Sequence, residues 1–242
     1  MMIASKTDIG RMRRSNQDAY ASGELTGGVA WAVVCDGMGG ANGGNIASAN
    51  AVKIVSERIA SNFRIGMSSS SVKNMLVSAI SAANIYVFDM AKNVEALSGM
   101  GTTIVAAIVC ESVLYVAHAG DSRCYVISDN DMSQVTTDHS IVQMMLEAGQ
   151  ITADEAKIHP KKNVITRALG VDELIDVDFN VVDLSQTDKI LICTDGLTNF
   201  LEHDDILKVI EDNNFYEYPE KLIDGANENG GGDNITVVVI SQ

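Results

Sequence analysis

The chain has 242 residues, of which 46% are hydrophobic, enough to build the core of one large domain or two small ones. Its 32 acidic and 17 basic residues give a formal net charge of -15, which disfavours nucleic acid and anionic membranes as partners because both are bound by clustered Lys and Arg. The amino terminus has no apolar stretch of signal-peptide length, and no later run approaches the ~20 apolar residues of a membrane span. We therefore expect a soluble, cytoplasmic protein.

Apolar runs of strand length recur along the chain, and their Val, Ile and Tyr content favours β-structure. These runs are Gly28–Cys35, Thr102–Cys110, Val113–His118, Arg123–Ile127, Lys189–Cys193 and Ile235–Ile240. Helical patterns cover Asn45–Asn62, Ser71–Lys92, Asp204–Asp212 and Pro219–Asn227. Because the helices fall in groups between runs of consecutive strands, the order predicts an α+β fold with antiparallel sheets covered by helices.

No linker divides the chain, which has only two prolines, so we expect a single domain over residues 1–242. The segment 141–167 interrupts the strand sequence with short helical patterns and is expected to be a surface excursion. The four cysteines lie inside apolar runs without any CxxC pair, which indicates structural thiols. They are Cys35, Cys110, Cys124 and Cys193.

An aspartate stands beside a glycine at the end of four apolar runs. The stretches are VVCDGMGG with Asp36, LYVAHAGDSR with Asp121, ILICTDG with Asp195 and GGGDNITVVV with Asp233. A single Asp-Gly pair is usually a turn. Four carboxylates at the ends of neighbouring strands would converge at one edge of a sheet and repel one another unless cations lay between them. The pattern therefore predicts a metal site.

The kind of metal follows from the donor atoms. The candidate ligands are oxygens, and the chain has no HExxH motif, no His-x-His pair and no paired cysteines, so Mg²⁺ or Mn²⁺ fits better than Zn²⁺. The four histidines are scattered along the chain. The glycine-rich stretch after Asp36 lacks the spacing of a dinucleotide fingerprint and the Lys-Ser/Thr pair of a P-loop.

Eight short motifs occur in register along the chain. They are GRMRRSNQD at 10–18, DGMGG at 36–40, SGMGTT at 98–103, GDSR at 120–123, DHS at 138–140, TRALG at 166–170, TDGL at 194–197 and GGDN at 231–234. From about Thr7 to Ile240, their order and spacing resemble the metal-dependent protein phosphatases of type 2C, the PPM family, in their compact bacterial form. The resemblance implies a four-layer sandwich of two antiparallel β-sheets flanked by α-helices, in which 141–167 is similar to the family's flap.

The activity that the resemblance implies is hydrolysis of phosphoserine and phosphothreonine on proteins by a water activated between two Mn²⁺ or Mg²⁺ ions. Asp36 matches the carboxylate that bridges the two metals, and the carbonyl of Gly37 matches a ligand of one of them. Asp195 and Asp233 match the ligands that complete the other metal. A bacterial Ser/Thr kinase is the expected counterpart, and a monomer is expected.

Three further residues carry over from the same motifs. Asp18 matches a carboxylate that orients metal-bound waters, and Asp121 with Asp195 matches a weaker third metal position. Arg13 matches the arginine that holds the substrate phosphate, a role suited to a guanidinium because it engages two phosphate oxygens at once. Asn16 and Asn234 are expected to shape loops. We assign structural roles to the remaining polar motif residues, namely Ser98, Thr102, Asp138 and Ser140.

The chain departs from the family pattern at the leaving-group acid. Many relatives carry histidine in the DGxGG turn or just after it, whereas this chain has Met38 and Ala41 there. A water held by a cation is our preferred acid, because the cation lowers its pKa. Two other functions stay open at this point: a catalytically silent module that binds phosphoproteins, and an enzyme that hydrolyses a small phosphate ester.

Overall fold

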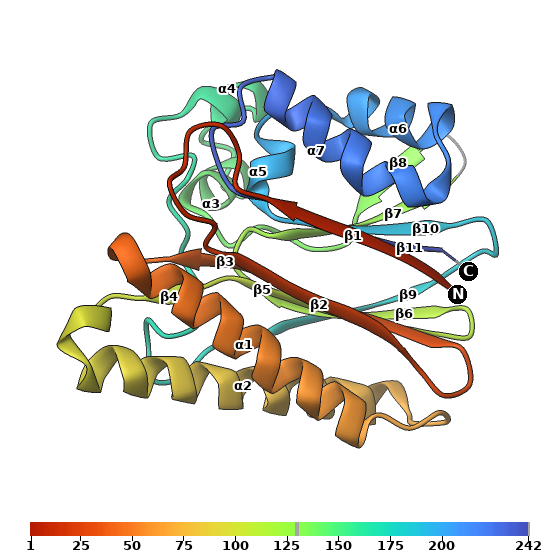
Figure 1. The fold of residues 1–242 in the computed structure, drawn as a ribbon, viewed down its shortest axis with the longest axis horizontal. Helices are drawn as coiled ribbons and strands as arrows, with labels where there is room; N and C mark the ends of the chain where they lie inside the picture. The colour runs from red at the N-terminus through yellow and green to blue at the C-terminus, as the bar shows by residue number, and fades with distance from the viewer. Residues whose placement is uncertain (129–130, 242) are drawn as a thin grey trace.

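Two antiparallel sheets stack face to face and are covered on their outer faces by helices (Figure 1). The computed structural model describes residues 1–128 and 131–241, without the side chains of residues 40–42. The first sheet has the order β1 (Met2–Asp8), β11 (Ile235–Ser241), β10 (Lys189–Cys193), β7 (Arg123–Ser128) and β8 (Asp131–Gln134). The second has the order β2 (Asp18–Leu25), β3 (Val29–Met38), β5 (Ile104–Cys110), β6 (Val113–Ala119) and β9 (Asp178–Asp183), and β4 (Gly101–Thr102) pairs with the end of β3. This confirms the predicted fold class.

The helices form the two outer layers (Figure 1). The second sheet is covered by α1 (Gly40–Asn62) and α2 (Ser69–Asn93), and the first sheet by α6 (His203–Asp212) and α7 (Tyr218–Glu228). Shorter helices are α3 (Ile141–Glu147), α4 (Ala153–Ile158) and α5 (Asp195–Thr198), and two 3₁₀ turns span Glu95–Leu97 and Phe215–Glu217. The four predicted helices are confirmed, although α1 begins at Gly40 and therefore earlier than expected.

Strands at the centre of the sandwich are mainly apolar because both of their faces are buried. Every residue of β11 is buried, as is every residue of β5 except Cys110 at its end. Their inner faces meet in a core that includes Val105, Ala107 and Val238. The strand β3 continues through Asp36 to Met38, so the prediction that this strand ends at Cys35 was wrong by three residues.

The helix α2 carries the apolar stripe that its sequence predicts. Its residues Val72, Leu76 and Ile80 are buried against the second sheet, and the side chain of Ser68 caps it by accepting a hydrogen bond from the N–H of Ser71. By length and composition α2 is also the one helix among the described residues that could cross a membrane, with a mean hydropathy of 1.2 over its most apolar window. This length and hydropathy differ from our expectation that no run of the chain approaches those of a membrane span. Its packing in the sandwich accounts for the apolar stripe.

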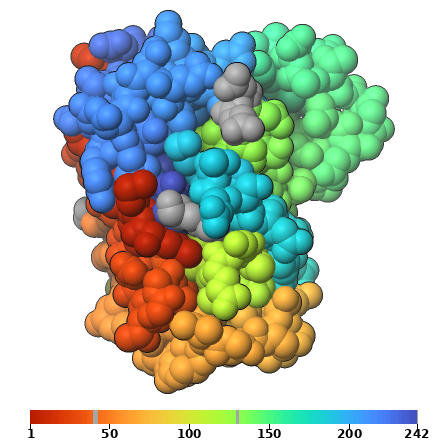
Figure 2. Space-filling view, turned by 90° about the vertical axis from the view of Figure 1, so that its right-hand side faces the viewer, coloured from red at the N-terminus to blue at the C-terminus, as the bar shows by residue number. Residues whose placement is uncertain are grey.

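The segment 141–167, called the flap below, projects from one side of the body (Figure 2). Its two ends are tied together, since Ser140 and Ile165 form an isolated β-bridge and the N–H of Thr166 donates to the carbonyl of His139. Ser140 also caps α3 by accepting from the N–H of Gln143. The flap therefore leaves and rejoins the body at one place.

Candidate active site

Five aspartates from different strands and strand ends come together at one end of the sandwich. Asp18 begins β2 and lies opposite Asp36 on β3. Asp121 follows β6, Asp195 follows β10 at the start of α5, and Asp233 precedes β11. All of them except Asp18 line a single cavity of about 350 Å³. The predicted convergence of strand-end carboxylates is thus present.

The carboxylates raise one another's pKa values because they are buried close together. Burial is the largest cause and raises the pKa of Asp18 and of Asp121 to about 7. The pKa of Asp36 lies well above its usual value through burial and then through the charges of Asp18 and Asp195. Burial and then the charge of Asp233 raise the pKa of Asp195. Such a group of acids is costly to ionise unless positive charge is placed among them.

Two carboxylate oxygens of this group are buried and have no hydrogen-bond partner among the described residues. They are Oδ1 of Asp18 and Oδ1 of Asp195. A buried polar atom is ordinarily paired, so each of these oxygens is explained by a ligand that the protein itself does not supply. The donors facing the cavity are oxygens, which hard divalent cations prefer. The residues present therefore fit Mn²⁺ or Mg²⁺.

The glycine-rich turn after Asp36 is required by close backbone packing. A Cβ atom on Gly37 would collide with the carbonyl oxygens of Gly44 and Gln17, and one on Gly44 would lie 2.7 Å from the carbonyl carbon of Gly37. The N–H of Gly37 donates to the carbonyl of Gln17 at 3.1 Å. Because these neighbours are main-chain atoms, they cannot move aside as a flexible side chain could. Only glycine at positions 37 and 44 therefore lets the end of β3 approach the start of α1 this closely.

Asp18 is held by two threonines that we did not predict. Its Oδ2 accepts hydrogen bonds from the hydroxyls of Thr194, at 2.9 Å, and Thr236, at 2.7 Å. Thr236 lies on β11 of the first sheet and Thr194 directly follows β10 of the same sheet, whereas Asp18 belongs to the second sheet, so this pair of bonds links the two sheets beside the cavity. The only sequence signal was that Thr194 adjoins Asp195 and Thr236 lies close to Asp233.

Arg13 reaches the cavity from the loop between β1 and β2. Its Nη2 lies 2.6 Å from Oδ2 of Asp233, and its side chain is 52% exposed. This hydrogen bond raises the pKa of Arg13 further. The other oxygen of Asp233 accepts from the N–H of Asn234 at 2.8 Å. The guanidinium therefore stands at the edge of the acidic group, in reach of solvent.

Asn234 secures the loop that carries Arg13, as we expected of it. Its Nδ2 donates to the carbonyls of Ile9 and Ser15, and its Oδ1 accepts from the N–H of Gln17. A single amide side chain thus ties three backbone groups of the 9–17 loop to the strand end beside Asp233. The loop-shaping role predicted for Asn16 is also confirmed, because its side chain bonds Thr7 and the N–H of Asp18.

Three of the other motif residues, Thr102, Asp138 and Ser140, make contacts that suit the structural roles we assigned to them. Arg123 forms an ion pair with Asp138 at 2.6 Å and, among the described residues, none with Asp121. The hydroxyl of Thr102 donates to the carbonyl of Asp36 at 2.8 Å. Met38 lines the cavity, and its thioether can donate no proton. The side chain of Ala41 lies outside the described residues.

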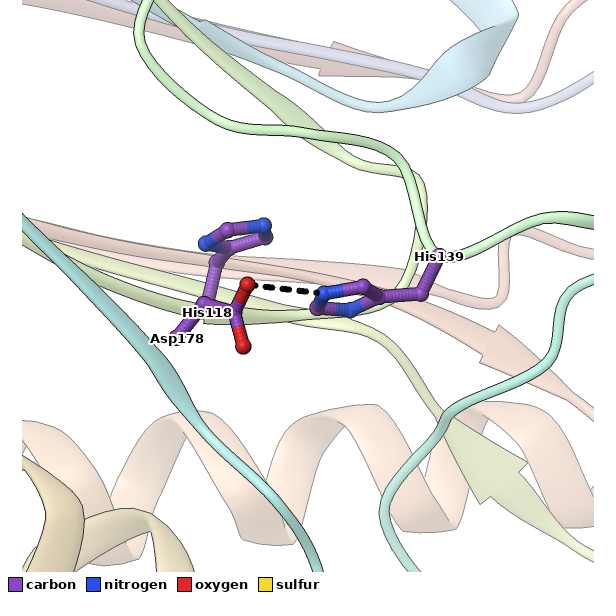
Figure 3. Close-up of side chains that lie close together, drawn as sticks. All are labelled: His118, His139 and Asp178. Carbon is purple, nitrogen blue, oxygen red and sulfur yellow. Dashed lines mark ion pairs between the residues drawn. The ribbon is translucent and has the colours of Figure 1, made fainter. Parts of the chain in front are cut away.

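A second group of potential ligands is formed by three residues that are not among those lining this cavity (Figure 3). One ligand atom each from His118, His139 and Asp178 fall within 4.8 Å of one another, and the two imidazoles stack with centroids 4.7 Å apart. Two histidines that are distant in sequence are therefore neighbours in the fold. Asp178 lies 3.3 Å from Nε2 of His139 and 2.7 Å from the guanidinium of Arg167.

The hydrogen bonds of this second group favour a structural role. The N–H of Gly120 donates to Nδ1 of His139 at 3.0 Å, so the lone pair of that nitrogen is already used within the protein. The guanidinium of Arg167 lies 2.9 Å from Nε2 of the same ring and would repel a cation. Burial lowers the pKa of His118 and of His139, which keeps both rings neutral. The group joins the flap ends to β6 and β9.

Known proteins of similar sequence span nearly the whole chain. A serine/threonine phosphatase stp of Listeria welshimeri is 38% identical over 98% of this chain and 94% of its own length. The protein phosphatase PhpP of Streptococcus pneumoniae is 37% identical over 100% of this chain and 98% of its own.

Solved structures agree with this similarity. The S. agalactiae serine/threonine phosphatase superposes with a TM-score of 0.92 at 34% identity, covering 100% of this chain and 99% of that one. A catalytic domain of the phosphatase PstP in complex with two manganese ions gives a TM-score of 0.85 at 30% identity, covering 98% and 96%. The family profile for protein phosphatase 2C matches residues 11–230. The chain therefore belongs to the protein phosphatase 2C family.

Proposed function

We propose that the chain removes phosphate from phosphoserine and phosphothreonine on bacterial proteins with the help of bound Mn²⁺ or Mg²⁺. One observation carries the proposal: aspartates from both sheets line one cavity with an arginine, and two buried carboxylate oxygens of the group have no protein partner. A cavity that combines cation ligands with a guanidinium suits a phosphate ester.

The carboxylates divide the work of holding the cations. Asp36 would bridge two of them with the Gly37 carbonyl as a further ligand, while Asp195 and Asp233 would complete one site. When bound, the cations supply a water of lowered pKa and neutralise charge on the phosphoryl oxygens. Asp18, held in place by its two threonine hydroxyls, would orient water beside them.

Arg13 would capture the substrate phosphate. Its side chain is half exposed, and its partner Asp233 is one of the proposed metal ligands. Where Asp233 held a cation, the guanidinium would be free to form two parallel hydrogen bonds with phosphate oxygens. Asp121 lines the same cavity, and the charge of Asp195 contributes to raising its pKa. It would hold a third and weaker cation.

The wider assignments of the proposal rest on the same family membership. Residues 1–242 form one catalytic domain with the flap at 141–167, which acts as a monomer in the cytoplasm and opposes a bacterial Ser/Thr kinase. The relatives that support the single phosphatase domain are bacterial proteins of which this chain covers 94% and 98%.

A metal-dependent turnover assay tests the proposal. We expect hydrolysis of both an aryl phosphate and phosphothreonine peptides that requires added Mn²⁺ and stops with a chelator. Binding of phosphopeptide without turnover under any divalent ion would favour a silent binding module. Turnover of a small phosphate ester far above that of phosphopeptides would favour a metabolic phosphatase.

A further inference from the structure

Basic side chains are scarce in this chain, yet five of them lie on the two segments that supply Arg13 and Asn163 to the cavity described above. The chain has 17 basic residues against 32 acidic ones. Three of the 17 nevertheless fall within four positions, at Arg11, Arg13 and Arg14, and all three are exposed. In a molecule of net charge -15, such a cluster creates a local positive field where anions are otherwise repelled.

The arginine loop is fixed beside the cavity and does not swing freely. The N–H of Arg11 donates to the carbonyl of Gly231 at 2.8 Å, and Asn234 holds the far end of the loop. Arg13 turns toward the cavity and pairs with Asp233. Arg11 and Arg14 form no ion pair with any residue that the structure describes. Their charges are therefore not compensated by ion pairs, and they lie on the loop whose Arg13 lines the cavity.

The flap contributes two further basic side chains near the cavities. Lys161 and Lys162 are exposed, and neither forms an ion pair within the described ranges 1–128 and 131–241. The next residue, Asn163, lines the catalytic cavity. Lys162 lines an adjoining cavity of about 430 Å³ that shares Asp121 and Asp195 with the first. Figure 1 shows the arginine loop and the flap at the same end of the sandwich.

The neighbouring lysine of the flap is different. Lys157 is paired with Glu202 at 2.7 Å, so its charge is already compensated. The uncompensated charge of the flap therefore lies at its cavity-side end, in Lys161 and Lys162. We call Arg11, Arg14, Lys161 and Lys162 together the basic rim.

We propose that the basic rim selects phosphorylated segments that carry further negative charge beside the phosphoresidue. This inference rests on the proposed phosphatase function and adds its substrate preference. With the phosphate in the cavity, an extended segment places residues two to four positions away at about 7–14 Å from the phosphate. Arg11 and Arg14 would read one flank of the segment, and Lys161 and Lys162 the other. Glutamate, aspartate or a second phosphate would each satisfy them.

Matched phosphothreonine peptides test the proposal on the Mn²⁺-loaded protein. The peptides differ only at positions two to four residues from the phosphothreonine on either side, which carry Gln, Glu or one additional phosphothreonine. We expect kcat/KM to be about three- to tenfold higher for Glu than for Gln on each flank, because each exposed ion pair contributes a modest amount. The advantage should shrink when the salt concentration is raised from 50 to 300 mM.

Double variants test which pair of basic side chains recognises which flank of the peptide. R11Q with R14Q should abolish the preference for Glu on one flank, and K161Q with K162Q the preference on the other. A matched control removes the same charge elsewhere, with K53Q and K73Q on the exposed surfaces of α1 and α2. In each protein the readout is the ratio of kcat/KM for the Glu and Gln peptides, which cancels any general change in activity.

The outcomes of these assays decide the matter. Retention of both preferences in the control and loss of one flank in each rim variant support the proposal. Equal kcat/KM for Glu and Gln peptides in the parent protein overturns it, as does equal loss in the control. If no peptide and no aryl phosphate is hydrolysed with Mn²⁺, then the proposed function has failed, whereas turnover without flank preference overturns only the inference about the basic rim.

Discussion

Asp18 and Asp36 lie directly opposite each other on the antiparallel strands β2 and β3, so their side chains share one face of the sheet. Like charges in this position are destabilising, and burial adds to the cost. The protein tolerates the pair because Thr194 and Thr236 donate to Asp18 and because the site suits cations. Stability and metal binding are therefore coupled at this pair.

Removing the charge of Asp18 should stabilise the metal-free protein at alkaline pH. Its folded pKa of about 7 exceeds the usual 3.8, so the stability that it contributes at low pH is lost as the pH rises from about 4 to about 7. Asp18→Asn escapes this loss, and we expect its melting temperature in chelator to exceed that of the parent by about 4 °C or more at pH 8, with a smaller gap at pH 5. Asp183→Asn, at an exposed position on β9, should show no gap. A variant that melts below the parent at pH 8 would contradict this account.

Asp36→Asn should abolish turnover while the fold persists. The change keeps the size of the side chain but removes the charge proposed to hold two cations together, so we expect kcat to fall by at least about a hundredfold. Calorimetric titration with Mn²⁺ should show weakened tight sites, and circular dichroism should show an unchanged fold. Parent-like turnover together with parent-like Mn²⁺ affinity would remove Asp36 from the proposed centre.

Arg13→Ala should weaken substrate binding more than metal binding. A charge-assisted contact to phosphate is lost, and we expect KM for phosphopeptides to rise by about tenfold or more. Arg13→Lys should recover part of this loss, because the ammonium keeps the charge but not the paired hydrogen bonds. If KM is the same in all three proteins, the pair between Arg13 and Asp233 is purely structural.

Asp121→Ala should separate leaving-group protonation from tight metal binding. We expect two tight Mn²⁺ sites to persist in calorimetry while kcat falls, with a loss about tenfold larger for phosphothreonine peptides than for aryl phosphates, whose phenolate leaves without a proton. Met38 cannot supply that proton, which gives Asp121 more weight here. Equal losses on both substrates would contradict the role in protonation, and loss of a tight site would place Asp121 among the main ligands.

Apart from the two-residue β4, the strands that the sequence did not predict are the edge strands of the two sheets. They are β1 and β8 in the first sheet and β2 and β9 in the second. Edge strands face solvent and carry polar residues: β2 has no buried residue, and β8 has one. Central strands such as β5 are buried on both faces and show up as continuous apolar runs. Apolar patterning therefore detected the middle of each sheet and missed its borders.

The candidate site shows the same division. Aspartates next to glycine at strand ends can be recognised in the sequence alone, and their convergence follows from the geometry of a sheet. Partners from other strands are not visible in this way. Neither the bonds from Thr194 and Thr236 to Asp18 nor the stacking of His118 on His139 follows from spacing, because each joins segments brought together only by the packing of the fold.

The pairing of β1 with β11 has a consequence for protein synthesis. Within the described structure β11 is the only strand beside β1, and they pair from Met2 with Ser241 to Asp8 with Ile235. On the ribosome, β1 cannot pair until β11 has been synthesised, and the arginine loop cannot form its hydrogen bonds to the side chain of Asn234 before then. A nascent chain has neither, so the hydrolytic site comes into being only when its final strand emerges.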